Sequence, residues 1–188
     1  DATPLEYRII LSNIPTNEKN LLLDRVRNFY TMIPTDSEYG KLCKWMKGLA
    51  KIPFGKYISL PVTMNDEQQK IAEFLNLSYN KLNQSTYGQF NAKNRIIEII
   101  AQWIANPNSK NKILALQGSA GVGKTNLIKN GVSNAFGLPF VFFSLGGMRD
   151  ISHFEGHNYT WEGSTWGKTV QSLMDTKCMN PIIFMDEL

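Results

Sequence analysis

Residues 117–125 read Gln-Gly-Ser-Ala-Gly-Val-Gly-Lys-Thr and fit the pattern G-x-x-x-x-G-K-[ST] at every fixed position. The three glycines let the backbone bend and point several N–H groups into one concavity, where an anion is held at the start of a helix. The pattern therefore predicts a nucleoside triphosphate site, in which Lys124 reaches the β and γ phosphates and the Thr125 hydroxyl binds Mg²⁺. The residues predicted to bind the nucleotide here are Gly118, Ser119, Ala120, Gly121, Val122, Gly123, Lys124 and Thr125.

The residues around this loop follow the order that such a site requires. Residues 112–116 form a short apolar run typical of a buried strand, and residues 124–136 predict a helix that leaves the loop. Further strands are predicted over 139–144 and 181–185, and a further helix over about 165–176. Right-handed crossovers between them give a parallel sheet with the loop at the carboxyl end of its first strand, which is an α/β fold.

The sequence before residue 110 is helical in pattern. Apolar residues at helical spacing predict a helix over 17–33 that ends at Pro34, and a second one that stops before Pro53. We expect these two helices to pack as a hairpin. Two more helical patterns run from residue 65 to about residue 84, and from about residue 86 to residue 105. We therefore divide the chain into a helical N-terminal segment, a helical entry and an α/β core, over residues 1–62, 63–110 and 111–188.

Composition excludes several classes of protein. A content of 43% hydrophobic residues in 188 residues is enough for an ordinary core, and no apolar run approaches the roughly 18 residues of a membrane span. The N-terminus has no signal-peptide pattern. Cys43 and Cys178 lie far apart without metal-binding spacing, so we expect both to be reduced and the protein to be intracellular. The net charge of +4 is thinly spread, which permits contact with nucleic acid without indicating it.

A second motif begins about 60 residues after the loop. Residues 182–187 read Ile-Ile-Phe-Met-Asp-Glu, an apolar strand that ends in two carboxylates, which is typical of a Walker B strand. Such a strand carries Asp186 to the Mg²⁺ coordination sphere, while Glu187 orients and polarises the attacking water. The alternative is a strand with an acidic, exposed end. Because the γ-phosphate sensor and the arginine of a neighbouring subunit normally lie further along such chains, we expect this sequence to be part of a longer protein.

The residues between and before the two motifs resemble the Lon family of ATP-dependent proteases, within the AAA+ ATPases. Residues 138–150 (LPFVFFSLGGMRD) are similar to the family's second strand and its Gly-Gly-Leu-Arg-Asp element, and residues 156–157 match its Arg-Gly-His. Residues 160–163 (TWEG) lie where the family has Thr-Tyr-Ile-Gly. Residues 37–54 are similar to the helical segment before the ATPase, and residues 86–88 to a His-Tyr-Gly element.

This resemblance implies a fold, cofactors and partners. It implies an AAA+ parallel sheet flanked by helices, ATP and Mg²⁺ as cofactors, and a homo-oligomeric ring, a hexamer, that unfolds and translocates protein substrates. It also implies a location in the cytoplasm or the mitochondrial matrix and no membrane partner. Tyr87 would lie next to adenine, and Trp161 and Glu162 would contact the substrate. Glu162 replaces an aliphatic residue of the family, and the family's Ser–Lys peptidase domain would follow residue 188.

Several alternatives stay open at this point. The altered loop at residues 161–162 also fits a non-proteolytic AAA+ remodelling or scaffold ATPase, and a nucleic-acid motor would need a basic stripe that we do not find. Tyr87 could pack on its own helix rather than on adenine. Trp161 and Trp166 fit either a loop that meets a ligand or a partly buried cluster. His153 and His157 share a helical spacing used by metal ligands, but the sequence offers no third ligand.

Overall fold

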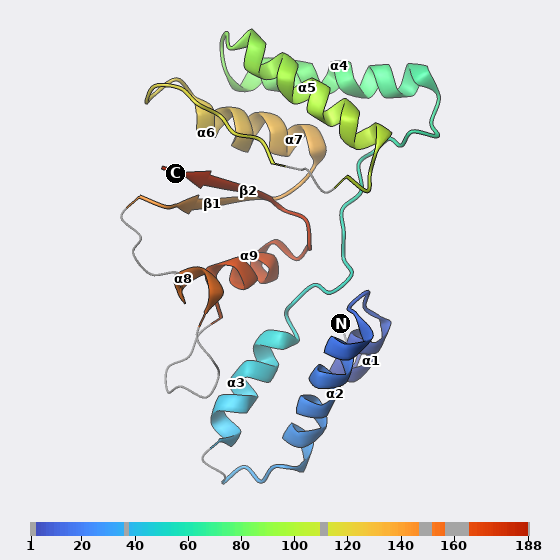
Figure 1. Ribbon diagram of the computed structural model, residues 1–188, viewed down its shortest axis with the longest axis vertical. Coiled ribbons are helices and arrows are strands. Elements are labelled where there is room, and N and C mark those ends of the chain that lie inside the picture. Colours follow the sequence, from blue (N-terminus) through green and yellow to red (C-terminus); the bar gives the residue numbers. More distant parts are fainter. Residues whose placement is uncertain (1–2, 36–37, 110–112, 147–151, 157–165, 188) are drawn as a thin grey trace. The chain divides into compact units, whose positions relative to one another are not determined.

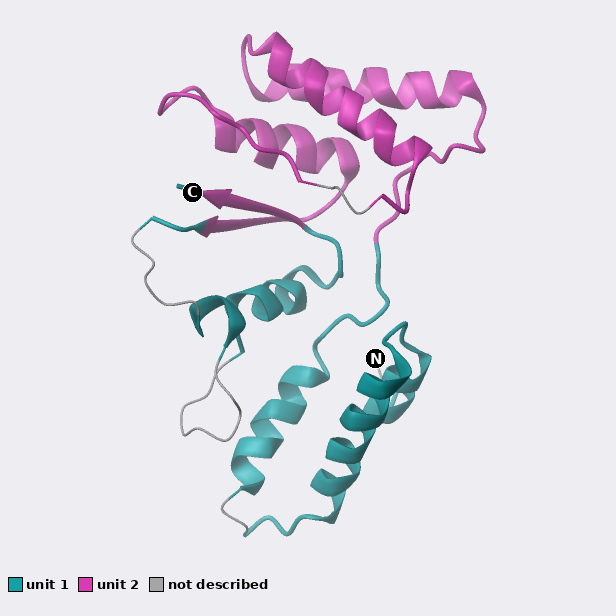
Figure 2. Cartoon of the chain, viewed as in Figure 1, with its two compact units in different colours: residues 1–57, 144–181, 187–188 teal, residues 58–143, 182–186 magenta. Residues whose placement is uncertain are grey.

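The computed structural model describes residues 3–35, 38–109, 113–146, 152–156 and 166–187. The chain forms two compact units, which Figure 2 colours separately. Unit 1 comprises residues 1–57, 144–181 and 187–188, and unit 2 comprises residues 58–143 and 182–186. Helices together with a small parallel sheet confirm the predicted α/β class with a helical region before it, while the three-part division of the sequence stays a prediction.

Unit 1 contains α1 (Leu5–Leu11), α2 (Thr16–Thr31), α3 (Tyr39–Leu49), α8 (Ser152–Glu155) and α9 (Lys168–Thr176), as Figure 1 shows. The helices α2 and α3 confirm the two predicted near the N-terminus, and they contact each other as expected. Helix α9 confirms the helix predicted over 165–176. The sequence pattern does not predict α1, because seven residues with only Ile9 buried are too few for a periodic signal.

The core of unit 1 joins the N-terminal helices to α9. Its buried members are Ile9, Val26, Leu42, Met46, Leu49, Ile52 and Met174. At its edge the rings of Trp45 and Trp166 stack with centroids 5.7 Å apart. A Cβ atom on Gly48 would lie 1.9 Å from the Trp166 indole nitrogen, so only glycine admits the ring at this position. Trp166 therefore belongs to a partly buried cluster.

Unit 2 contains the remaining elements. These are α4 (Gln68–Ser85), α5 (Phe90–Ala105), α6 (Lys124–Asn126), the π-helical segment η1 (Leu127–Val132), α7 (Ser133–Phe136), β1 (Phe140–Ser144, whose last residue belongs to unit 1) and β2 (Ile182–Asp186). They confirm the helices predicted from residues 65 and 86, the helix over 124–136 and the two later strands, with bounds that move by a few residues. Among the described residues, no helix is long and apolar enough to cross a membrane.

The helical stretch 124–136 approaches α4 closely. Gly131 lies in η1, and a Cβ atom there would lie 2.8 Å from Ser85 Oγ and 2.9 Å from Leu82 Cδ2. Because glycine has no Cβ, the two helices can pack at this short distance. The residue pattern predicts the helix, but nothing in it predicts that its middle turn is π-helical.

The sheet consists of β1 and β2, which are neighbours and run parallel, since their arrowheads point the same way in Figure 1. The Ile182 amide donates to the Pro139 carbonyl at 2.8 Å at the start of the pair. Phe184 stacks between two rings of β1, with centroids 6.2 Å from Phe140 and 5.9 Å from Phe142. Aromatic pairs across the strands thus add to the backbone ladder.

The prediction of a first strand over 112–116 is wrong for residues 113–116, the part that the structure describes, because no ladder of backbone hydrogen bonds is recorded there. Leu114 and Leu116 pack against the core of unit 2, whereas Ile113 is 93% exposed. This alternation is that of a strand, but a strand also needs a hydrogen-bonded neighbour. The apolar run therefore predicts neither the strand pairing nor the exposure of Ile113.

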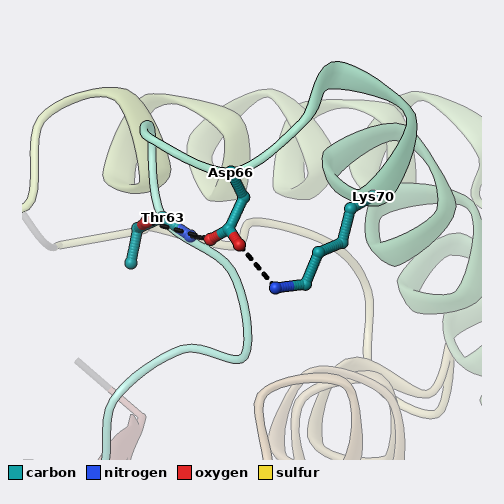
Figure 3. Close-up of polar contacts among 3 residues, drawn as sticks. All are labelled: Thr63, Asp66 and Lys70. Carbon is teal, nitrogen blue, oxygen red and sulfur yellow. Dashed lines mark hydrogen bonds and ion pairs between the residues drawn. The ribbon is translucent and has the colours of Figure 1, made fainter.

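A carboxylate fixes the turn that leads into α4, as Figure 3 shows. Asp66 accepts hydrogen bonds from the Thr63 amide at 2.7 Å and the Thr63 hydroxyl at 2.9 Å, and it also pairs with Lys70. The bond from Lys70 and those from Thr63 stabilise the ionised form, which lowers the pKa of Asp66 from 3.8 to about 2.

Because the pKa of Asp66 is lower in the folded state, its carboxylate stabilises the fold above about pH 4, and this contribution disappears as the pH falls towards 2. We therefore expect Asp66→Asn to lower the melting temperature at pH 6, and the difference from the unmodified protein to shrink towards zero at pH 2. Melting followed by circular dichroism across this range tests the expectation. Asp24→Asn is the control, since Asp24 pairs with Arg27 at 3.8 Å in an exposed position and should change little at any pH. A constant difference across the range would contradict the role given to the Asp66 charge.

Candidate functional site

The loop over residues 117–123 connects the irregular segment 113–116 to α6 within unit 2. Gly121 and Gly123 have φ angles of +78° and +90°, in the left-handed region that other residues rarely adopt. Gly118 does not share this conformation, and a Cβ atom there would meet its nearest neighbour, Val122 Cγ2, at an ordinary 3.5 Å. The left-handed glycines are therefore the two of the three that lie nearest the start of the helix.

The helix begins at Lys124, with Gly123 as its N-cap residue. The Leu127 amide closes the first turn by donating to the Gly123 carbonyl at 2.9 Å. Lys124 and Thr125 are half-buried in this turn, while Leu127 and Ile128 are buried in the core. The free N–H groups and the positive end of a helix favour an anion at this point.

The Lys124 ammonium lies over its own loop. Its Nζ donates to the Gly118 carbonyl at 2.8 Å and to the Ser119 carbonyl at 2.9 Å. These two acceptors hold the charge next to the backbone that the sequence assigns to phosphate binding. A phosphate oxygen is a better acceptor for an ammonium than a carbonyl oxygen, so the lysine can exchange these bonds for an anion.

A cavity of about 440 Å³ lies beside the loop. One part of its wall comes from the loop and the helix after it, and the other comes from the start of α5. The lining residues are Gln89, Phe90, Asn91, Ala92, Leu116, Gln117, Gly118, Ser119, Val122, Lys124 and Leu127. Its volume falls in the range of small-molecule and cofactor pockets. The cavity thus extends the predicted phosphate site towards residues 89–92, which we call the α5 wall.

The sequence pattern does not indicate the residues of the α5 wall. Tyr87, which the resemblance assigns to adenine, has a fully exposed side chain and does not line the cavity, so this assignment stays a prediction. Phe90 lines the cavity and is 63% exposed. The one feature of the sequence that points to a turn before the α5 wall is Gly88, because glycine is common where the backbone turns with a positive φ. In the structure the φ of Gly88 is +68°.

The two acidic residues of the second motif follow β2. Asp186 is the last residue of the strand and is half-buried. In Figure 1 the arrowheads of both strands and the first turn of α6 lie towards the same side of unit 2. Thr125 and Asp186 supply a hydroxyl and a carboxylate, the hard oxygen ligands that Mg²⁺ prefers, so the residues fit the predicted ion.

Glu187 has a φ of 61°, which is uncommon for a residue other than glycine. The Ser144 hydroxyl donates to Glu187 Oε2 at 3.4 Å. A Cβ atom on Gly146 would lie 1.7 Å from the same oxygen, so the glycine leaves room for the carboxylate. The Glu187 carboxylate therefore lies beside the end of β1 and the turn after it.

Other predicted site residues lie outside the described part of the chain. Trp161 and Glu162, assigned to substrate contact, are among them, and so is His157 of the possible metal pair. His153 lies in α8. Among the residues that the structure describes, no group of three or more His, Cys, Asp or Glu side chains is arranged to hold a metal ion.

Comparison with known proteins agrees with the loop and the fold. Residues 114–188 match the model of the ATPase family associated with various cellular activities (AAA). The chain is 30% identical over 196 residues to a Lon protease homolog of Acanthamoeba polyphaga mimivirus, which covers 100% of this chain and 18% of the relative. It is 30% identical over 188 residues to a Lon protease of Brucella abortus, covering 100% of this chain and 22% of the relative.

A third relative is the mitochondrial Lon protease homolog 1 of Dictyostelium discoideum, which is 32% identical over 180 residues, covering 95% of this chain and 17% of the relative. The chain thus spans about a fifth of the length of these relatives. The similarity includes the helical residues before the loop as well as the loop itself. The chain is therefore similar to Lon proteases over its whole length, and its residues 114–188 match the AAA ATPase family.

Proposed function

We propose that the cavity of unit 2 binds ATP, with the triphosphate on residues 118–125 and the nucleoside towards the α5 wall. The observation that carries this proposal is the continuity of the cavity between the loop and residues 89–92. Backbone N–H groups at the start of the helix and the Lys124 ammonium supply positive charge at one part of it. Phe90 supplies an aromatic face at the other, and an aromatic face is suited to stacking on a base.

We further propose that bound ATP is hydrolysed to ADP and phosphate with the help of the acidic residues at the end of β2. Thr125 and Asp186 would hold Mg²⁺, which neutralises charge that develops on the phosphate oxygens. Glu187 would orient a water molecule and accept its proton, and Ser144 would keep the Glu187 carboxylate in position. As water attacks the γ-phosphorus and its bond to ADP breaks, Lys124 would stabilise the negative charge on the β and γ phosphates.

For the whole protein we propose the ATPase module of an ATP-dependent protease that unfolds and translocates protein substrates. Relatives named Lon protease, from bacteria and mitochondria, support this proposal. It includes a hexameric ring, substrate contact by Trp161 and Glu162, and a location in the cytoplasm or the mitochondrial matrix. The alternative is a non-proteolytic remodelling or scaffold ATPase, since Glu162 places a carboxylate where the family has an aliphatic residue.

Lys124→Ala should weaken ATP binding by about a hundredfold, because it removes a charged donor from the phosphate site. Calorimetric titration of the full-length protein with ATP measures the loss. Lys129→Ala is the matched control, since Lys129 lies on the same helical stretch with an exposed side chain and should leave the affinity unchanged. Equal affinities for the two variants would remove Lys124 from the site.

Glu187→Gln should bind ATP normally and hydrolyse it about 10² to 10⁴ times more slowly, because glutamine keeps the shape of the side chain but cannot accept the proton of the attacking water. Phosphate release under saturating ATP measures the rate, and the titration above measures binding. If the variant hydrolyses ATP at the unmodified rate, Glu187 is not the base.

The choice between a protease and a remodelling ATPase can be tested on the full-length protein with casein as an unfolded substrate. We expect casein to stimulate ATP hydrolysis and peptides to be released in the same reaction. Phosphate and peptide release are followed together, and the Glu187→Gln variant is the control for ATP dependence. Stimulated hydrolysis without peptide release would favour the remodelling ATPase and end the protease proposal.

A further inference from the structure

Lys93 is a buried lysine that the proposed chemistry does not use. It lies on the inner face of α5 and is 1% exposed. Its Nζ donates to the Thr86 carbonyl at 2.6 Å and to Asn83 Oδ1 at 3.0 Å, and both of these acceptors are neutral. Removing an ammonium group from water is costly unless hydrogen bonds compensate for it, so the position of Lys93 depends on these two acceptors.

The segment that Lys93 holds is the connection between α4 and α5. Asn83 lies in the last turn of α4, and Thr86 is its C-cap residue. Gly88 and Gln89 follow with φ angles of +68° and +54°, and the left-handed conformation of Gln89 is unfavourable for a residue with a side chain. Such a connection persists only when surrounding contacts fix it, and the two hydrogen bonds from the buried Lys93 are contacts of this kind.

The connection in turn touches the phosphate loop and forms the α5 wall. The Gln89 side-chain amide donates to the Val122 carbonyl. A Cβ atom on Gly123 would lie 3.1 Å from Thr86 Cγ2, so the threonine methyl group lies against the loop. Phe90 lines the cavity, and its ring centroid lies 5.9 Å from Lys93 Nζ. A change at Lys93 therefore reaches the cavity through the residues that it holds.

We propose that Lys93 is a positioning residue for the nucleoside part of the ligand. By fixing Thr86 and the turn through Gln89, it sets the α5 wall, which meets the base and ribose, while the triphosphate is bound by the loop and Lys124. This inference rests on the proposed binding of ATP. The affinity for ATP then has two contributions. Contacts with the α5 wall strengthen the binding of a nucleotide only, whereas contacts with the loop and Lys124 strengthen the binding of a nucleotide and of a free polyphosphate alike.

The test compares ATP with inorganic tripolyphosphate on the full-length protein. Lys93→Met keeps the length and apolar stem of the side chain but removes the donors, leaving the Thr86 carbonyl and Asn83 without their partner. We expect it to weaken ATP binding about tenfold and to change tripolyphosphate binding less than about threefold. Calorimetric titration gives both affinities, and circular dichroism checks that the variant folds.

Lys81→Met is the matched control. Lys81 lies on α4 and donates to a backbone carbonyl, that of Asn134 at 2.9 Å, but it is exposed and does not line the cavity. It should leave the ratio of the two affinities unchanged. Asn83→Ala is a milder variant that keeps the proposal testable if Lys93→Met does not fold; it removes one acceptor and should weaken ATP binding about threefold relative to tripolyphosphate.

Two failures can be told apart. If the unmodified protein does not bind ATP, the proposed function falls, and this inference falls with it. If it binds ATP no more tightly than tripolyphosphate, the nucleoside makes no favourable contact and the role of Lys93 is overturned. If the unmodified protein prefers ATP, and Lys93→Met or, where that variant does not fold, Asn83→Ala has an unchanged ratio of affinities, then only the role of Lys93 is overturned. An equal loss for both ligands would likewise assign Lys93 to the stability of unit 2 as a whole.

Discussion

The packing of the helical stretch 124–136 against α4 and α5 is the interaction on which the candidate site depends. Leu127, Ile128 and Val132 are at most 6% exposed and lie in the core that these helices share. Burial of such side chains contributes roughly 1.5–3 kcal/mol each, more than the net contribution of a typical hydrogen bond. Since the stretch begins directly after the loop, the same burial fixes its first turn, and with it Lys124. The geometry of a polar, exposed loop is thus set by the apolar core next to it.

Within the site, the two parts of the cavity wall are suited to different parts of a nucleotide. The loop provides a concave backbone, through the left-handed Gly121 and Gly123, and a cation held on its own carbonyls. It is suited to any polyphosphate. The α5 wall provides an amide and an aromatic ring from Gln89 and Phe90, which a polyphosphate does not need. In the proposed site, specificity for a nucleotide would depend on how the connection between α4 and α5 is held, and Lys93 donates hydrogen bonds to this connection from a buried position.

How well each feature is predicted depends on how far apart in the sequence the residues that produce it lie. Helical periodicity is local, so α2 to α5 and the stretch 124–136 are predicted within a few residues. The strand predicted over 112–116 is wrong in its described part because pairing depends on a neighbour distant in sequence. The apolar pattern also does not separate the partly buried Leu114 and Leu116 from Ile113, which is 93% exposed. The α5 wall is not predicted for a related reason. Gln89 and Phe90 belong to no motif, and only the folded chain places them beside the loop.

By itself the sequence determined the phosphate-loop pattern, the acidic end of β2, the helical pattern and the similarity to Lon proteases, because each depends on residues that are adjacent or regularly spaced in the sequence. The tertiary structure alone decided the cavity, the contact of Gln89 with Val122, and the placement of Ser144 beside Glu187. Pairs more than 30 residues apart meet only after the intervening chain has folded. A motif can therefore specify the phosphate contacts, whereas the shape of the rest of the site is a property of packed helices and strands.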